Sequence, residues 1–267
     1  MTGAPAESPA APMFSRRQWL ALAAASAAAP APLAAQAPFV PTPDPVIQAM
    51  LDLAAVRRGE RLVDLGCGDG RIVLAAARRG AVARGIDNDA ELIDRARRRA
   101  ELEGLGANAR FETGDLFDAR VRDADIVTLY LLSSMNARLR PKLMTELRAG
   151  ARIVSHAFDM GDWAPDAMRV AEEKNVFLWI VPAVVGGDWQ LRLGDGSAGL
   201  LTFEQRFQRI AGQFRGAALS GANLDGARLS FRLGGLLFAG RVGDRTIEPD
   251  PDGPAEAEAG WQASRIA

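Results

Sequence analysis

A glycine-rich segment between a buried strand and a helix constrains the fold of this chain more than any other feature. The segment is VDLGCGDGR, residues 63–71, in which every second position from 66 to 70 is glycine. The apolar run 61–65 is typical of a buried strand, and the run 72–77 begins a helix. Glycines at such a turn let the backbone bend sharply and approach a ligand, while the helix N-terminus offers free N–H groups. We therefore predict a ligand site at the carboxyl end of this strand.

Strands and helices alternate along the first half of the chain. The apolar pattern predicts further strands at 82–86, 109–113, 125–130 and 151–155, and further helices from Asp44–Pro45 onward, at 89–103 and at 134–147. This alternation favours a parallel sheet that is covered by helices on both faces. We expect an α/β fold with a doubly wound, mostly parallel, seven-stranded sheet.

After residue 163 the pattern changes to strands with few helix signals. Two strand-like runs, 175–182 and 189–193, flank a glycine pair, and short strands recur between 200 and 247; only residues 204–210 resemble a helix. The last residues are acidic and typical of a solvated tail. We therefore predict an α/β domain over 38–194, a small all-β appendage over 195–248 and a flexible acidic tail over 249–267.

Three five-residue repeats occur within residues 217–231. They resemble pentapeptide repeats, which build a β-solenoid. A solenoid needs about three stacked coils to bury its core, and three pentapeptides do not complete one coil. A hairpin with small residues is the favoured interpretation.

Residues 1–37 have the order of an export signal. Arg16 and Arg17 precede a short alanine-rich run, 19–29, which falls well below the roughly 20 apolar residues that a membrane span needs. Small residues follow at 33–37, and the arginine pair resembles a twin-arginine signal. We predict a periplasmic or otherwise exported protein. The alternatives are an uncleaved leader that tethers the protein to the membrane, and a cytoplasmic protein whose true start lies later.

Net charge and rare residue types exclude several functions. The 267 residues carry a formal net charge of −1, which gives no reason to expect binding to nucleic acid. Cys67 is the only cysteine and His156 the only histidine, which excludes an intramolecular disulfide and a histidine-rich metal site. After the leader, no apolar run approaches membrane-spanning length. We expect no nucleic-acid partner, no metal and no integral membrane segment there.

Acidic residues accompany the glycines at the ends of the predicted strands. The spacing is G-x-G-x-G, and Arg71 stands where a dinucleotide-binding motif has its last glycine. Asp64 and Asp69 suit a ligand with a cationic end better than a pyrophosphate. Asp87 ends the second strand, where a carboxylate can accept hydrogen bonds from two ribose hydroxyls, and Asp115 follows the third strand, where it can receive the amino group of a base. An NAD-dependent oxidoreductase is therefore the weaker interpretation.

Together these motifs resemble those of the class I S-adenosylmethionine-dependent methyltransferases, over about residues 41–193. The resemblance implies a Rossmann-like fold that binds S-adenosyl-L-methionine. It places the glycine loop under the methionine part, Asp64 near the ammonium group, Asp87 on the ribose, and Asp115 with Leu116 at the adenine. The cofactor-binding residues that it implies are Asp64, Gly66, Cys67, Gly68, Asp69, Gly70, Asp87, Asn88, Asp115 and Leu116.

A narrower resemblance concerns the segment FVPTP, residues 39–43, the glycine loop and the run TLYLL, residues 128–132. These are similar to the protein-lysine methyltransferases that modify the mitochondrial ATP synthase c-subunit and adenine nucleotide translocase. In those enzymes the Val-Pro-Thr-Pro segment closes over the active site. The resemblance implies methyl transfer to an amine, with a protein lysine as one candidate. Those proteins lack an appendage like residues 195–267, so a small-molecule acceptor stays open.

The acceptor would lie beside the fourth and fifth strands. Tyr130 ends the fourth strand and can hydrogen-bond an incoming amine or hydroxyl; Thr42 can line the entrance. We take Tyr130 and Thr42 as candidate catalytic residues, with a buried tyrosine and a simple turn residue as the structural alternatives. His156 is either a general base or a structural histidine. Phe158 and Trp163 form either an aromatic wall for a cationic acceptor or part of the core.

Two classes of function remain after these arguments. The main interpretation is a methyltransferase that acts on a protein side-chain amine or a small molecule. The alternative is an exported cofactor-binding or assembly protein on the same fold, without turnover, whose β appendage recognises an envelope partner. Product formation distinguishes the two.

Overall fold

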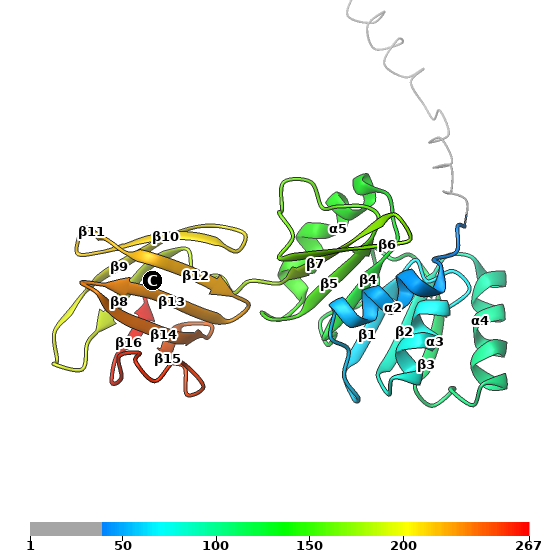
Figure 1. Ribbon diagram of the computed structural model, residues 1–267, viewed down its shortest axis with the longest axis horizontal. Helices are drawn as coiled ribbons and strands as arrows, with labels where there is room; N and C mark the ends of the chain where they lie inside the picture. Colours follow the sequence, from blue (N-terminus) through cyan, green and yellow to red (C-terminus); the bar gives the residue numbers. More distant parts are fainter. Residues whose placement is uncertain (1–38, 267) are drawn as a thin grey trace, which may run out of the picture. The chain divides into compact units, whose positions relative to one another are not determined.

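The computed structural model describes residues 39–266, which form two β-sheets and four helices (Figure 1). From Pro41 onward they belong to one compact unit. The predicted export signal, residues 1–37, lies outside the described residues and stays a prediction. No helix within 39–266 is both long and apolar enough to cross a membrane.

The first sheet has seven strands in the order β3-β2-β1-β4-β5-β7-β6. The strands are β1 (Arg61–Leu65), β2 (Val82–Asp87), β3 (Ala109–Thr113), β4 (Ile126–Leu129), β5 (Arg152–His156), β6 (Ala167–Ala171) and β7 (Lys174–Ile180). Strands β1 to β5 pair in parallel, whereas β7 runs antiparallel to both β5 and β6. The prediction of a mostly parallel, seven-stranded sheet is confirmed. The strand order reverses at β1, where open α/β sheets bind their ligands.

Helices cover both faces of this sheet. They are α2 (Asp44–Leu53), α3 (Arg71–Arg78), α4 (Ala90–Leu102) and α5 (Ser133–Glu146). Apolar side chains of α2, α3 and α4 pack with one face of the strands, and those of α5 pack with the other. Along β1 the two faces alternate, so Leu62 joins the first cluster while Val63 and Leu65 join the second. Asp89 caps α4, because its side chain accepts from the N–H groups of Glu91 and Leu92.

The second sheet is antiparallel and has nine strands in the order β11-β10-β9-β8-β16-β15-β14-β13-β12. They are β8 (Gly187–Arg192), β9 (Ala198–Arg206), β10 (Arg209–Phe214), β11 (Ala217–Ala218), β12 (Ser220–Asp225), β13 (Arg228–Leu233), β14 (Leu236–Val242), β15 (Thr246–Pro249) and β16 (Gln262–Arg265). The sheet curls around its own apolar cluster, in which Trp189, Phe203 and Phe231 are buried. The repeat region forms the β12–β13 hairpin, which confirms the hairpin interpretation.

The boundaries of the all-β part differ from the prediction. Strand β8, which falls within the predicted α/β domain over 38–194, pairs with β9 and β16 of the second sheet. The predicted flexible tail over 249–267 contains β16, since Trp261 and Ala263 bury their side chains in the core despite the acidic surroundings. Residues 204–210, which resemble a helix in sequence, lie instead in β9, β10 and the turn between them.

Candidate active site

The glycine loop leaves β1 and enters α3 in a conformation that requires glycine. Gly66, Gly68 and Gly70 have φ values of +80°, +52° and +77°, a region that other residues adopt only with strain. A Cβ at Gly66 would lie 2.9 Å from Leu131 Cδ2, and one at Gly70 would lie 2.5 Å from Phe111 Cε1. The sequence predicts that these glycines let the backbone approach a ligand. In the structure, neighbouring side chains also lie too close to Gly66 and Gly70 to leave room for a Cβ.

Asp87 connects the end of β2 to the glycine loop. Its Oδ2 accepts a hydrogen bond from Gly68 N at 2.8 Å, and its Oδ1 accepts one from Asp89 N at 3.0 Å. The residue is half-buried, and each carboxylate oxygen has a second lone pair for a ligand. One side chain thus shapes the loop and presents an acceptor at the carboxyl end of β2.

Asp64 lies fully buried at the base of the loop. Thr128 Oγ1 donates to Asp64 Oδ1 at 2.7 Å, while Oδ2 is buried and has no partner among the described residues. Burial raises the pKa of Asp64 to about 7; the Thr128 hydrogen bond opposes the rise, and the charges of Asp87 and Asp69 add to it. A buried carboxylate with a free oxygen fits a ligand that brings a positive charge or an N–H donor.

The raised pKa makes stability depend on pH, and we expect Asp64→Asn to remove that dependence. The folded pKa of about 7 lies above the ordinary value of 3.8, so between these values the folded state holds a proton that the unfolded state has released. Stability then falls as the pH rises through this window. The asparagine keeps an oxygen for Thr128 but does not titrate. The unfolding free energy of the variant, relative to that of the unaltered protein, should therefore be about 2 kcal/mol higher at pH 8 than at pH 5. Urea unfolding of the ligand-free protein measures both gains.

The exposed Asp123→Asn variant is the control for this experiment, since Asp123 lies on the surface beside Arg120. It should change stability little at either pH. Equal gains for Asp64→Asn at pH 5 and pH 8 would show that Asp64 is ionised throughout the range, contrary to the prediction.

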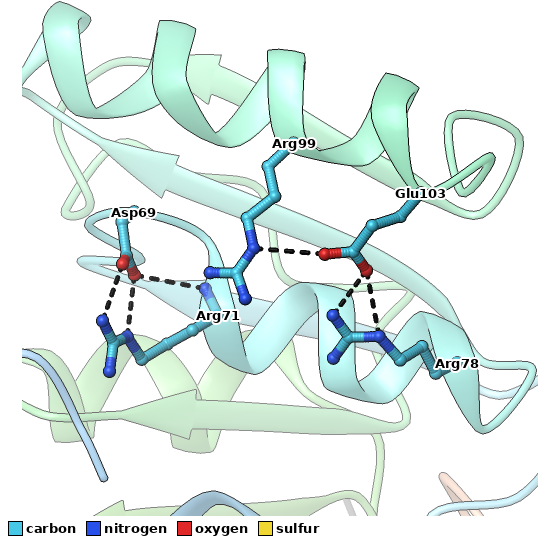
Figure 2. Close-up of polar contacts among 5 residues, drawn as sticks. All are labelled: Asp69, Arg71, Arg78, Arg99 and Glu103. Carbon is cyan, nitrogen blue, oxygen red and sulfur yellow. Dashed lines mark hydrogen bonds and ion pairs between the residues drawn. The ribbon is translucent and has the colours of Figure 1, made fainter. Parts of the chain in front are cut away.

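Asp69 and Arg71 connect the glycine loop to the segment before α2. Asp69 accepts from Arg71 Nε at 2.9 Å and from Arg71 Nη2 at 2.8 Å, and Arg71 Nη1 donates to the carbonyl oxygen of Thr42 at 2.9 Å. Figure 2 shows this pair beside Arg99 of α4, which bonds Glu103. Both Asp69 oxygens therefore face Arg71. Sequence reasoning missed this role of Arg71, which it used only to reject the dinucleotide motif.

Tyr130, Thr42 and His156 come together at the carboxyl ends of β4 and β5. The Tyr130 ring stacks on the His156 ring with centroids 3.9 Å apart, and the Phe158 ring lies 6.2 Å from that of Tyr130 on centroids. Thr42 Oγ1 lies 3.4 Å from His156 Nδ1. The two candidate catalytic residues thus meet around the histidine, beside the row of acids on β1 and β2.

The histidine at the centre of this cluster is neutral at pH 7. His156 is 2% exposed, and burial, helped by the charge of Lys174, lowers its pKa to about 4. A group with that pKa is a weak base near neutrality. The structural interpretation of His156 is therefore favoured over that of a general base.

Asn136 holds the turn that follows β5, a role that no sequence signal indicates. Its Nδ2 donates to Ser155 Oγ at 3.2 Å and to the carbonyl oxygens of Phe158 and Asp159, each at 3.1 Å. Ser155 Oγ also donates to the Phe158 carbonyl at 2.6 Å. Ala157 within the turn has φ +65°, so the backbone there is strained. These bonds fix the position of Phe158 beside Tyr130.

The other predicted site residues take various positions. Cys67 is buried against Gly85, where an added Cβ would lie 2.6 Å from its Sγ, which fits a packing role. Asn88 and Asp115 are exposed, and Asp115 Oδ1 accepts from Phe117 N at 2.8 Å. Leu116 is half-buried. Trp163 is fully buried in the core, not in an aromatic wall with Phe158.

The chain is similar to a known protein family. The ANTKMT methyltransferase domain model matches residues 64–167. This range begins at Asp64 and contains the glycine loop, Asp87, Asp115, Tyr130 and His156. It ends within β6, before the second sheet begins.

Several curated proteins are similar to part of the chain. A protein-lysine N-methyltransferase of Saccharolobus islandicus is 37% identical over 150 residues, which are 54% of this chain and 93% of that protein. The human lysine N-methyltransferase of the ATP synthase c-subunit is 36% identical over 129 residues, 48% of this chain and 55% of that protein. The chain thus spans nearly all of the archaeal protein and little more than half of the human one.

A solved structure is similar over nearly all of its length. It is described as an RNA methyltransferase from Salinibacter ruber in complex with S-adenosyl-L-homocysteine. It is 48% identical, the match covers 55% of this chain and 96% of that one, and the TM-score is 0.54.

Proposed function

The chain belongs to the class I S-adenosylmethionine-dependent methyltransferases, and we propose that its acceptor is the side-chain amine of a lysine in a protein. The observation that carries the proposal is the stacking of the Tyr130 ring on the buried, neutral ring of His156, beside the acids at the ends of β1 and β2. The similarity to a protein-lysine N-methyltransferase over 93% of that protein supports it. A binding protein without turnover is not favoured, because the relatives named above are methyltransferases.

We propose that the acids and glycines at the ends of β1, β2 and β3 hold S-adenosylmethionine. Asp64 Oδ2, which lacks a partner within residues 39–266, suits the ammonium group. The free lone pairs of Asp87 suit the ribose hydroxyls, and Asp115 with Leu116 suits the adenine. When bound, S-adenosylmethionine supplies a methyl group on a positively charged sulfur, which is already activated toward attack by an amine.

The residues around Tyr130 then have two tasks. A lysine amine must be neutral for its lone pair to form the new N–C bond. The bond between the methyl group and the sulfur would break with its electron pair staying on the sulfur, and the nitrogen would release one proton to solvent for each methyl group that it gains. An environment of half-buried aromatic rings and a neutral imidazole disfavours the charged ammonium form and so lowers the pKa of the amine. The Tyr130 hydroxyl can accept a hydrogen bond from that amine and orient its lone pair, and orientation accounts for much of such catalysis.

RNA is the second candidate acceptor, because the similar Salinibacter structure is described as an RNA methyltransferase. The net charge of −1 does not favour it, since proteins that bind nucleic acid usually carry a basic surface. Parallel assays distinguish the two. The acceptors are a peptide with one central lysine, the same peptide with arginine in its place, and an unmodified structured RNA, each with methyl-labelled S-adenosylmethionine. Label in the lysine peptide alone supports the proposal; label in the RNA alone overturns it.

Tyr130→Phe is expected to lower kcat for the lysine peptide about 10- to 100-fold, which corresponds to one strong hydrogen bond in the transition state. The affinity for S-adenosylmethionine should stay within about twofold, because Tyr130 lies at the end of β4, outside the acid row. Steady-state kinetics and calorimetry measure the two quantities. An unchanged kcat would mean that the hydroxyl takes no part and that only the ring matters.

A further inference from the structure

The turn between β9 and β10 contacts the segment that follows β5. Gln208 in this turn accepts a hydrogen bond from Trp163 Nε1 at 2.9 Å. Its own Nε2 donates to the Ala164 carbonyl at 2.7 Å and to Asp166 Oδ1 at 3.3 Å. Trp163 is fully buried, so its N–H depends on Gln208 for a partner. A single glutamine between two strands of the second sheet therefore satisfies polar groups of the segment between β5 and β6.

The residues on either side of Gln208 add to this contact. The Phe207 ring stacks on that of Trp163, with centroids 5.7 Å apart and an interplanar angle of 17°. Arg206 Nη2 donates to Asp162 Oδ2 at 3.0 Å. From α5, Arg140 donates to the Met160 carbonyl at 2.7 Å, and its guanidinium lies 5.2 Å from the centroid of Phe207. Phe207 has φ +55°, a conformation that a bulky residue seldom keeps without such support.

The contacted segment includes Phe158, whose ring lies beside Tyr130. We call Thr42, Tyr130, His156 and Phe158 the acceptor cluster. Asn136 fixes its first part through the carbonyls of Phe158 and Asp159. Residues 206–208 fix its last part through Asp162, Trp163 and Ala164. The segment is thus held at both ends. Asn136 lies within the region that the family model matches, whereas residues 206–208 lie outside it.

We propose that Gln208 is a positioning residue for the acceptor side of the active site, so that the second sheet supports methyl transfer through the segment 157–164. Gln208 does not touch the acceptor cluster itself; it acts through Trp163 and Ala164. The cofactor side, at the ends of β1, β2 and β3, has no such contact with the turn among the described residues. Loss of Gln208 therefore affects the acceptor and leaves cofactor binding unchanged. The kinetic part of this inference rests on the proposed function, whereas the structural part does not.

Hydrogen exchange of the full chain tests the structural part without any acceptor. Gln208→Ala and Gln208→Met are compared with Gln213→Ala, which changes an exposed glutamine of β10. Met keeps most of the volume of the side chain and removes its hydrogen bonds, so it remains informative if Ala disturbs the fold. We expect exchange in peptides covering 157–164 to quicken about tenfold in both Gln208 variants, with no change in peptides covering 64–71. Exchange in 157–164 that matches the Gln213→Ala control overturns the proposal.

Binding and turnover complete the test. Calorimetry should give the same affinity for S-adenosylmethionine in all three variants, within about twofold. With the lysine peptide, Gln208→Met should lower kcat/KM about tenfold, whereas Gln213→Ala should not. Altered exchange with unaltered kcat/KM would overturn the catalytic role of the contact. If the unaltered protein methylates no lysine peptide, the proposed acceptor fails, and the exchange result still decides whether Gln208 positions the segment.

Discussion

Asp87→Ala is expected to weaken the binding of S-adenosylmethionine by at least about 100-fold. The carboxylate accepts from Gly68 N at 2.8 Å and from Asp89 N at 3.0 Å, so its removal releases the glycine loop as well as the proposed acceptor of the ribose hydroxyls. Hydrogen bonds to a charged group contribute roughly 1.5–3 kcal/mol each, and about 1.4 kcal/mol corresponds to a tenfold change in affinity. Isothermal calorimetry of the chain without residues 1–37 measures the loss, with NAD as the ligand control.

Two further variants separate the roles of Asp87. Asp87→Asn keeps one oxygen acceptor and loses the charge, so its affinity should lie between those of the unaltered protein and the alanine variant. Asp244→Ala removes an exposed acid from the turn before β15 and should bind normally. Equal affinity of Asp87→Ala and the unaltered protein would place the cofactor elsewhere and remove the basis of the proposed site.

Gly70→Ala is expected to destabilise the fold by about 3 kcal/mol or more. Gly70 has φ +77°, where an alanine is strained by roughly 1–2 kcal/mol. The added Cβ would also lie 2.5 Å from Phe111 Cε1 and 2.8 Å from Ala96 Cβ, both in buried residues that have little room to move. Overpacking of this kind costs a further ~1–3 kcal/mol. Urea unfolding measures the change.

Gly59→Ala is the matched control. Gly59 has φ +83°, nearly the same backbone conformation, but no atom lies within 4 Å of a Cβ built on it. It should therefore show the backbone strain alone, about 1–2 kcal/mol. Equal losses at the two positions would mean that Phe111 moves aside and that packing adds nothing to the requirement for glycine at the loop.

The acids and glycines that we propose to hold the cofactor could be placed in the fold from the sequence, because they are recognisable one strand at a time. Each acid follows a short apolar run, and parallel strands place their carboxyl ends at one edge of the sheet. Asp64, Asp87 and Asp115 therefore needed no knowledge of distant contacts. The glycine loop was equally local, since a strand, a turn and a helix follow each other directly in the chain.

Contacts between distant segments could not be predicted from the sequence in the same way. Arg71 reaches Thr42, Asn136 reaches Phe158, and Gln208 reaches Trp163, across separations of 29, 22 and 45 residues. Nothing in the composition around these side chains marks their partners. Thr42 and Tyr130 are separate candidates in the sequence, and only the structure shows that His156 lies between them.

The boundaries of the all-β part escape sequence reasoning for a related physical cause. An apolar run predicts a strand but does not say which strand it pairs with. The run at 189–193 follows the α/β strands directly in the chain, while β8 in fact pairs with β9 and β16. Acidic residues around 250–260 obscure β16, whose burial depends on Trp261 and Ala263 alone.

The pairing of β8 with β16 sets an order for folding during synthesis. All strands of the first sheet have been made by Ile180, so that sheet can form while the ribosome is still adding residues, as domains commonly do. In the second sheet, by contrast, β8 cannot complete its pairing until β16, which ends at Arg265, has been made. Until then the edges of β8 and β15 that pair with β16 stay open in the nascent chain, and open strand edges promote aggregation.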